Sequence, residues 1–269
     1  FEDRKISVDF SCYFEEGLEV RWCKNDLKSH KKYFYALQEF TNDIVITVDD
    51  DVYYSKYMVE ELLKYHHKYP NAILSRRGHL ITAKSDGYIS DYENWWGECS
   101  NYIGIRRMDL CATGIGGVLY PPHVMPEETF NINNIKKYCL YADDIWLKIM
   151  QLINNVPTVV VQEYFYDTPI EEYIYDGLYD SHNHSGGNDR QLNNLIKIYG
   201  KDSTGEQKLI QSIFSDGRIF ESDIEKEKEK TGKKGFNDII KKVENADKVV
   251  IYGAGKVGYS YWNMLINGR

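Results

Sequence analysis

Three consecutive aspartates, Asp49, Asp50 and Asp51, directly follow a mostly β-branched run, Ile44 to Val48. A run that does not alternate with charged residues is typical of a buried strand, so we expect a central, parallel strand here. Ligands of open α/β sheets bind at the carboxyl ends of the strands, where the three acids would stand. Carboxylates spaced as Asp-x-Asp hold a hard divalent ion that also bridges two phosphates. Because three adjacent like charges need a cation, we favour a metal site over an acidic loop that caps the next helix.

Phosphatases of the aspartyl-phosphate type also place Asp-x-Asp after a strand, and the first aspartate is their nucleophile. In this chain Asp49 and Asp51 would take those two positions. Such enzymes normally carry Thr or Val two residues after the second aspartate, where this chain has Tyr53. The phosphatase hypothesis therefore stays open as the alternative.

A second acidic pair, Asp143 and Asp144, precedes apolar residues from Ile145 to Ile153 that keep the spacing of a helix. Acids at the start of a helix are stabilised by the open amides and the helix dipole, so the pair alone indicates only a helix N-terminus. Combined with the first cluster, the pair becomes a candidate general base for a hydroxyl nucleophile.

The elements that would position these acids follow a layered α/β pattern. A helix is predicted from about Ser55 and ends at Pro70, and strands are predicted at Ala72 to Ser75 and Thr158 to Val161. A strand, a helix and a strand within about 30 residues indicate a βαβ unit. We also predict helices over Asp26 to Phe40 and Leu192 to Tyr199. The expected fold class is α/β, with a mixed sheet flanked by helices.

Composition excludes several classes of protein. The chain has 269 residues, 41 of them acidic and 33 basic, so its net charge of -8 argues against a protein that wraps nucleic acid. Its length suggests one to two domains. The five cysteines include no Cys-x-x-Cys pair, so we expect neither a disulfide framework nor a zinc site, and we expect a reducing cytoplasmic location. No apolar run approaches the length of a membrane span.

Three linked segments carry a family resemblance: Ile46 to Asp51 (Ile-Thr-Val-Asp-Asp-Asp), Gly116 to Tyr120 (Gly-Gly-Val-Leu-Tyr) and Ala142 to Trp146 (Ala-Asp-Asp-Ile-Trp). In this order they resemble bacterial glycosyltransferases of the GT-A fold, of the kind found in capsule and O-antigen gene clusters. The resemblance covers roughly residues 15 to 200 and implies a GT-A-like, Rossmann-related mixed sheet. Enzymes of this type begin with a strand that makes the first nucleotide contacts, and we expect that strand to be missing here.

The resemblance implies an inverting transfer of a sugar from a nucleotide-sugar, a UDP-sugar, to a saccharide or lipid-linked saccharide during surface polysaccharide biosynthesis. It gives Asp51 the role of direct ligand to Mn²⁺ or Mg²⁺, places Asp49 near the donor ribose and makes Asp144 the base, with Asp143 beside it. A lipid-linked acceptor would bring the enzyme to the inner face of a membrane. The other residues expected at the site are a third metal ligand, His184, and the substrate-binding candidates Asp50, Arg76, Arg77, Lys31, Gly116, Gly117, Trp95 and Trp96.

The C-terminal residues indicate another unit. Lys248 to Tyr252 reads as a buried strand, and Gly253, Gly255 and Gly258 follow it in the context of a dinucleotide fingerprint. The acid that would confirm this motif falls beyond Arg269. We therefore expect a glycosyltransferase domain at 1–200, a charged helical linker at 201–247 and the beginning of a Rossmann-like domain at 248–269, which would bind a dinucleotide or S-adenosylmethionine. An enzyme whose main ligand binds at that unit is a further alternative.

Overall fold

The computed structural model of this chain describes residues 11–99, 101–161, 168–169, 186–201 and 207–229. The chain divides into two compact units, Phe1–Glu221 and Ser222–Arg269. The glycine motif at Gly253, Gly255 and Gly258 lies outside the described residues, and so does His184.

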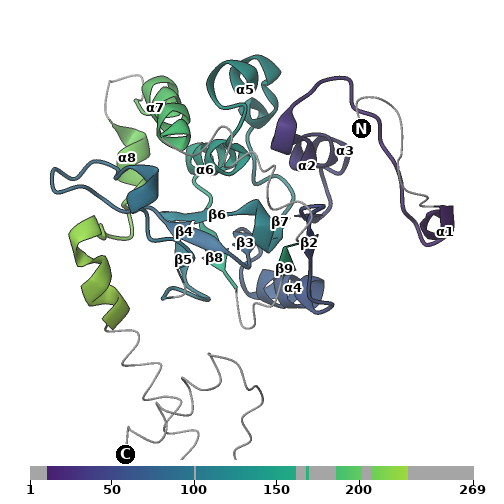
Figure 1. Cartoon of the computed structure of the whole chain (residues 1–269), viewed down its shortest axis with the longest axis horizontal. Helices are drawn as coiled ribbons and strands as arrows, with labels where there is room; N and C mark the ends of the chain where they lie inside the picture. The colour runs from purple at the N-terminus through teal and green to yellow at the C-terminus, as the bar shows by residue number, and fades with distance from the viewer. Residues whose placement is uncertain (1–10, 100, 162–167, 170–185, 202–206, 230–269) are drawn as a thin grey trace, which may run out of the picture. The chain divides into compact units, whose positions relative to one another are not determined.

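A five-stranded mixed sheet forms the centre of the first unit, in the order β1-β7-β3-β8-β5 (Figure 1). β7 is antiparallel to both of its neighbours, β3 and β8 are parallel, and β5 is antiparallel to β8. The expected α/β class with a mixed sheet flanked by helices is confirmed. The strands are Val45–Thr47 (β1), Ile73–Ser75 (β3), Arg106–Arg107 (β5), Val118–Tyr120 (β7) and Thr158–Val160 (β8).

The strand that precedes the aspartates is not central. Among the described residues β1 stands at one end of the sheet and pairs only with β7, to which it is antiparallel. Its flanking residues Ile44 and Val48 are 38% and 45% exposed. The expectation of a central strand paired in parallel was therefore wrong, because a short β-branched run is equally compatible with an edge whose outer side is open.

Alternating strand residues show that both faces of the sheet are covered. Leu74 of β3 and Leu119 of β7 pack with α4, Met58–Lys68, on one face. Their neighbours Ile73 and Val118 belong to the larger core on the other face. That core holds α5, α6 and α7, which lie on the opposite side of the sheet from α4 in Figure 1. The bounds of these helices are Ile132–Tyr138 (α5), Asp143–Ile153 (α6) and Gly187–Tyr199 (α7).

The described residues also form two smaller sheets and several short helices. The predicted helix over Asp26 to Phe40 is present only as separate turns, and α7 begins before its predicted start at Leu192. The two-stranded sheets pair β2 with β9 and β4 with β6. Their strands are Val52–Tyr53 (β2), Thr168–Pro169 (β9), Gly78–Leu80 (β4) and Leu110–Ala112 (β6). The short helices are Ser11–Phe14 (α1), Lys28–His30 (η1), Lys31–Phe34 (α2), Ala36–Glu39 (α3), Tyr92–Asn94 (η2), Gly114–Gly116 (η3), Glu127–Phe130 (η4), Lys208–Ile213 (α8) and Glu221–Asp223 (η7).

The segment after residue 200, expected to begin a charged linker, contributes to the first unit. Leu209 and Ile213 of α8 are buried in the main core, which also contains α6. The amide of Ala83 donates to the carbonyl of Ile219 at 2.8 Å. The apolar residues of this short helix explain why it packs here, whereas the charged run begins only at Glu221.

The two adjacent tryptophans are core residues. Trp95 is 5% exposed and its indole N–H donates to the carbonyl of Ser90 at 3.0 Å, and Trp96 is 6% exposed. Neither lines the cavity described below, so the expectation that they stack on a sugar does not agree with their position. Burial of so much apolar surface favours the core for such side chains.

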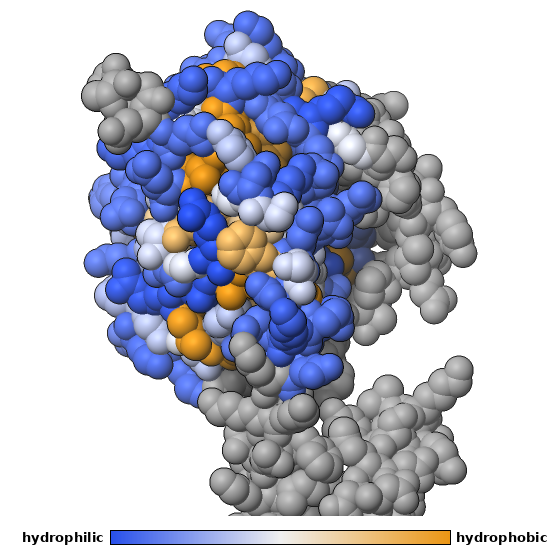
Figure 2. Space-filling model, turned by 90° about the vertical axis from the view of Figure 1, so that its left-hand side faces the viewer, coloured by the Kyte–Doolittle hydropathy of each residue, from blue (hydrophilic) through white to orange (hydrophobic). Residues whose placement is uncertain are grey.

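No helix in the described part of the chain combines the length and apolar character needed to cross a membrane. The face drawn in Figure 2 is largely hydrophilic, and its apolar residues form separate small groups. Such scattered apolar residues are normal on a protein surface.

Candidate functional site

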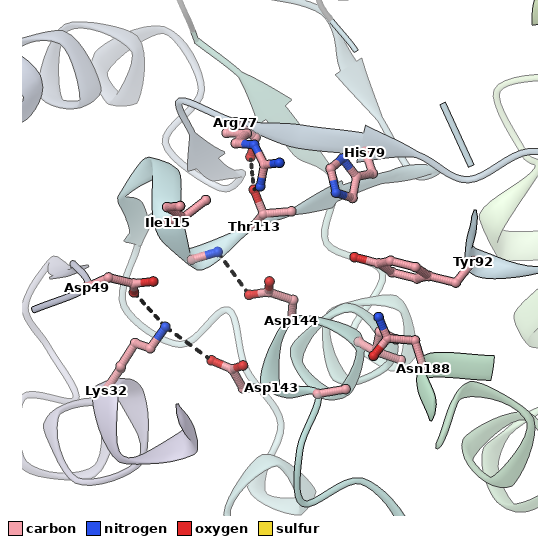
Figure 3. Close-up of a pocket in the computed structure, with 13 residues that line it drawn as sticks. Lys32, Asp49, Arg77, His79, Tyr92, Thr113, Ile115, Asp143, Asp144 and Asn188 are labelled. Carbon is pink, nitrogen blue, oxygen red and sulfur yellow. Dashed lines mark hydrogen bonds and ion pairs between the residues drawn. The ribbon is translucent and has the colours of Figure 1, made fainter. Parts of the chain in front are cut away.

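A cavity of about 400 Å³ lies beyond the end of β1, where several elements of the sheet and the helices meet. This volume is within the range of small-molecule sites. Figure 3 shows side chains from α2, the loop after β1, η3, α6 and α7 converging on it. Thirteen residues line it: Lys32, Asp49, Arg77, His79, Tyr92, Thr113, Gly114, Ile115, Ala142, Asp143, Asp144, Ile145 and Asn188.

Antiparallel pairing brings the two acidic segments together. Thr47 at the end of β1 is opposite Val118 at the start of β7, so the loop after β1 lies near η3, which precedes β7. The amide of Gly114 in η3 donates to Oδ1 of Asp144 at 3.0 Å. Asp49 and Asp144, distant in sequence, therefore share one cavity.

A lysine lies between the acids. Nζ of Lys32 is 2.5 Å from Oδ1 of Asp49 and 3.8 Å from Oδ2 of Asp143. Burial acts to lower the pKa of Lys32, but the charges of Asp143, Asp49 and Asp144 outweigh burial and raise it above its usual value. The ammonium thus stays charged at neutral pH and offsets part of the negative charge.

Asp144 has the properties of a base matched to neutral pH. Burial raises the pKa of its carboxyl to about 8, and the charge of Asp143 adds to the rise. Lys32 and the Gly114 amide act in the opposite direction. Asp143 and Asp144 are the first two residues of α6, and the N-cap position before them is Ala142. The predicted helix N-terminus is confirmed, and both acids lie in the first turn of the helix.

The three adjacent aspartates differ in environment. Asp49 is half-buried, whereas Asp50 and Asp51 are exposed and do not line the cavity. Burial raises the pKa of Asp49 against the opposing effect of Lys32, and the charges of Asp143 and Asp51 contribute to the rise. Across the described residues, no three His, Cys, Asp or Glu side chains converge in an arrangement that could hold a metal ion.

The backbone geometry at Gly116 and Gly117 favours glycine. A Cβ on Gly116 would lie 2.7 Å from the backbone nitrogen of Arg77. Gly117 has φ +77°, a conformation that side chains disfavour. Gly116 and Gly117, which we expected at the substrate, do not line the cavity, whereas Gly114 does.

Gly114→Ala should weaken ligand binding while the fold is retained. The added Cβ would lie 3.0 Å from Nζ of Lys32 and 3.5 Å from carboxylate oxygens of Asp144 and Asp49, so it would fill the space between the charged groups. If UDP binds in this cavity, as the family resemblance implies, we expect its affinity to fall about tenfold or more, since crowding by one methyl group costs about 1–3 kcal/mol. Calorimetric titration measures the affinity, and unchanged affinity would contradict this use of the space.

In each of the adjacent basic pairs Arg76–Arg77 and Lys31–Lys32, one residue lines the cavity and the other does not. Arg77 lines the cavity, donates to Oγ1 of Thr113 at 3.3 Å and pairs with Glu98 at 2.8 Å. Arg76 is 1% exposed and pairs with Glu61 at 2.7 Å, so it does not reach the cavity. Lys32 enters the cavity, whereas the expected Lys31 lies 3.7 Å from Asp26 outside it.

One wall of the cavity is uncharged and was not predicted from the sequence. It consists of His79, Tyr92 and Asn188. Burial and the charge of Arg77 lower the pKa of His79 to about 4. Its Nδ1 accepts from the Glu98 amide at 3.0 Å, so Nε2 carries the proton of the neutral ring. The sequence could have indicated His79, because it is two positions after Arg77. Alternate residues of a strand share a face, so the two side chains would point the same way. Asn188 and Tyr92 gave no such signal.

No family model matches this chain, and no match is found among curated proteins.

The cavity combines groups of complementary chemistry. A buried carboxyl near neutral pKa, a charged lysine and an arginine border one cavity with an uncharged polar wall. A base beside cations is suited to deprotonating a hydroxyl while a negatively charged group departs.

Proposed function

We propose that this chain is a GT-A-like glycosyltransferase that moves a sugar from a nucleotide-sugar, a UDP-sugar, to a saccharide or lipid-linked saccharide with inversion. The observation that carries the proposal is the position of Asp144. Its carboxyl has a pKa raised to about 8 and shares a cavity with Asp49 and Lys32. General bases are most effective when their pKa is near the working pH.

In the proposed reaction the oxygen of an acceptor hydroxyl forms a bond to the anomeric carbon of the donor. The bond from that carbon to the diphosphate breaks on the opposite face, and the diphosphate keeps the electron pair. Asp144 takes the hydroxyl proton on its carboxylate oxygen. Lys32 supplies positive charge to the same cavity, which favours a departing diphosphate.

The acids after β1 are suited to a divalent cation that is bound together with the donor. Such ions are commonly held by one or two carboxylates plus substrate phosphates and water, so three converging protein ligands are not required. Exposed Asp51 and half-buried Asp49 would hold the ion, which would supply Lewis-acid neutralisation of the diphosphate. Binding to Asp49 would compete with the ammonium of Lys32, which lies 2.5 Å from it.

The phosphatase alternative would make Asp49 the nucleophile. That carboxylate is bound by Lys32, and the hypothesis gives no role to the carboxyl of Asp144, which lines the same cavity. The transferase hypothesis uses both acidic segments, and we prefer it for that reason.

The test is a calorimetric titration of UDP and GDP, with and without Mn²⁺, on the unchanged chain and on Asp51→Ala. We expect metal-dependent binding of UDP, weakened at least tenfold in Asp51→Ala because a metal-binding carboxylate is lost. The exposed Glu60→Gln on α4 is the matched control and should bind as the unchanged chain does. Metal-independent binding that Asp51→Ala leaves intact would contradict the metal assignment. Hydrolysis of p-nitrophenyl phosphate without nucleotide binding would favour the phosphatase.

A further inference from the structure

The cavity has a charged side and an uncharged side, with Asp144 between them. Figure 3 shows Lys32 and Asp49 on one side and Tyr92 and Asn188 on the other. The Tyr92 hydroxyl points into the cavity from its uncharged side. A group bound against this wall would therefore meet Asp144 from the side away from Lys32 and Asp49.

Asn188 has an unsatisfied buried atom on this uncharged side. The residue is 5% exposed, and its Oδ1 has no hydrogen-bond partner among the described residues. A buried carbonyl oxygen without a partner is unfavourable, and such groups in folded proteins call for an explanation. Because Asn188 lines the cavity, a ligand that donates a hydrogen bond would satisfy the oxygen.

We propose that His79, Tyr92 and Asn188 form the acceptor subsite, and that Asn188 Oδ1 selects an uncharged saccharide by accepting from one of its hydroxyls. The inference rests on the proposed transferase function and adds the chemical class of the acceptor. It also places that acceptor on the side of Asp144 opposite to Lys32 and Asp49.

The surrounding charges favour a neutral acceptor. Asp143, whose negative charge contributes to the raised pKa of Asp144, lines the cavity and would repel a carboxylated or sulfated sugar. The Arg77 guanidinium, which would attract such a group, already pairs with Glu98 at 2.8 Å. Uncharged His79 adds a donor without adding charge.

The aromatic ring of Tyr92 fits the apolar face of a sugar ring. The residue is half-buried, and its ring centroid is 4.7 Å from that of Trp95 and 6.0 Å from that of His79. These contacts hold the ring in place, so an apolar surface and a hydroxyl tip are presented together. Sugars offer both C–H faces and hydroxyls, which matches a wall of this composition.

The test is binding of methyl glycosides in the presence of UDP and Mn²⁺, followed by saturation-transfer NMR. The probes are the methyl glycosides of glucose, galactose and N-acetylglucosamine, with methyl glucuronide as the charged comparison. We expect the unchanged chain to bind at least one neutral glycoside more tightly than the glucuronide. Asn188→Leu should weaken that binding about tenfold, the upper range for one neutral hydrogen bond.

Thermal stability separates a binding role from a structural role of Asn188. Leucine has nearly the same shape and removes an oxygen that has no described partner, so the Tm of Asn188→Leu should be unchanged or higher. The matched control is Asn134→Leu, because Nδ2 of Asn134 donates to Glu128 at 2.6 Å and to Tyr199 at 3.0 Å. That variant should lower the Tm and leave glycoside binding unchanged.

Several outcomes would overturn the acceptor subsite. One is unchanged glycoside binding by Asn188→Leu. Another is displacement of the glycoside by UDP-galactose but not by UDP, because that result would assign the wall to the donor sugar. If Asn188→Leu does not fold, Asn188→Ala replaces it, and unchanged glycoside binding by that variant has the same meaning. UDP binding without glycoside binding rejects this inference alone, whereas binding of neither rejects the proposed function too.

Discussion

Asp144→Asn is expected to lower the rate of sugar transfer by about 10²–10⁴-fold, the usual contribution of a general base. The amide oxygen can still accept from the Gly114 amide, which lies 3.0 Å from Oδ1 of Asp144, so the local geometry is retained. UDP binding should therefore persist while turnover is lost. The measurement is transfer from the UDP-sugar that binds best to the glycoside that binds best, and Glu60→Gln serves as the control.

The pH dependence distinguishes a lost base from a damaged fold. Since the pKa of Asp144 is raised to about 8, the rate of the unchanged chain should rise with pH through that value, and the residual rate of Asp144→Asn should not follow it. The raised pKa means that the folded chain holds a proton that the unfolded chain releases near pH 4. This contribution to stability is present at low pH and is lost as the pH rises to about 8.

The asparagine variant avoids that loss, because it carries no ionisable group at this position. We therefore expect its Tm to exceed that of the unchanged chain at pH 8.5, even though its activity is lower. A variant that keeps the full rate, or one that melts lower at pH 8.5, would contradict the assignment of Asp144 as a buried base.

Lys148→Met is expected to stabilise the fold by about 3 kcal/mol at pH 7, the value of a pKa shift of this size. Lys148 is 2% exposed, and its ammonium has no hydrogen-bond partner among the described residues. Burial lowers its pKa to about 8, against the opposing charges of Cys111, Asp109 and Asp216. Methionine fills a similar volume without a charge to bury.

The sign of the effect follows from proton binding. The unfolded chain keeps the Lys148 proton up to about pH 10.5, whereas the folded chain releases it near pH 8. The stability of the unchanged chain therefore rises between these values, and the advantage of Lys148→Met is largest below pH 8 and shrinks above it. Urea denaturation at pH 7 and pH 10 measures both points. Lys197 is exposed, so Lys197→Met is the control and should change the free energy of unfolding little. If Lys148→Met were less stable than the unchanged chain, the result would indicate a buried anionic partner of Lys148.

Local pattern was sufficient to predict the helices and strands that carry a strong periodicity. The apolar spacing after Asp143 predicted α6 with its correct start, and the runs at 72–75 and 158–161 predicted β3 and β8. The same reasoning predicted the α/β class. It did not predict the separate turns over 26–40, because tertiary packing rather than periodicity determines where such short elements begin and end.

Sequence by itself determined which acids could do chemistry, since carboxylates that follow a strand or begin a helix are recognisable from their neighbours. Only the tertiary structure decided which of two adjacent residues enters the cavity. Arg77 and Lys32 line it, while Arg76 pairs with Glu61 inside the protein. Adjacent side chains point in different directions from a strand or a helix, so only the packed backbone fixes their roles.

The same limit explains the edge position of β1, the burial of the two tryptophans and the uncharged wall with Asn188. Each of these features depends on contacts between segments that are distant in the sequence, and the local hydrophobic pattern does not predict such contacts. The pKa of Asp144 is set in the same way, because burial and the nearby charges of Asp143, Lys32 and Asp49 exist only once the chain is folded.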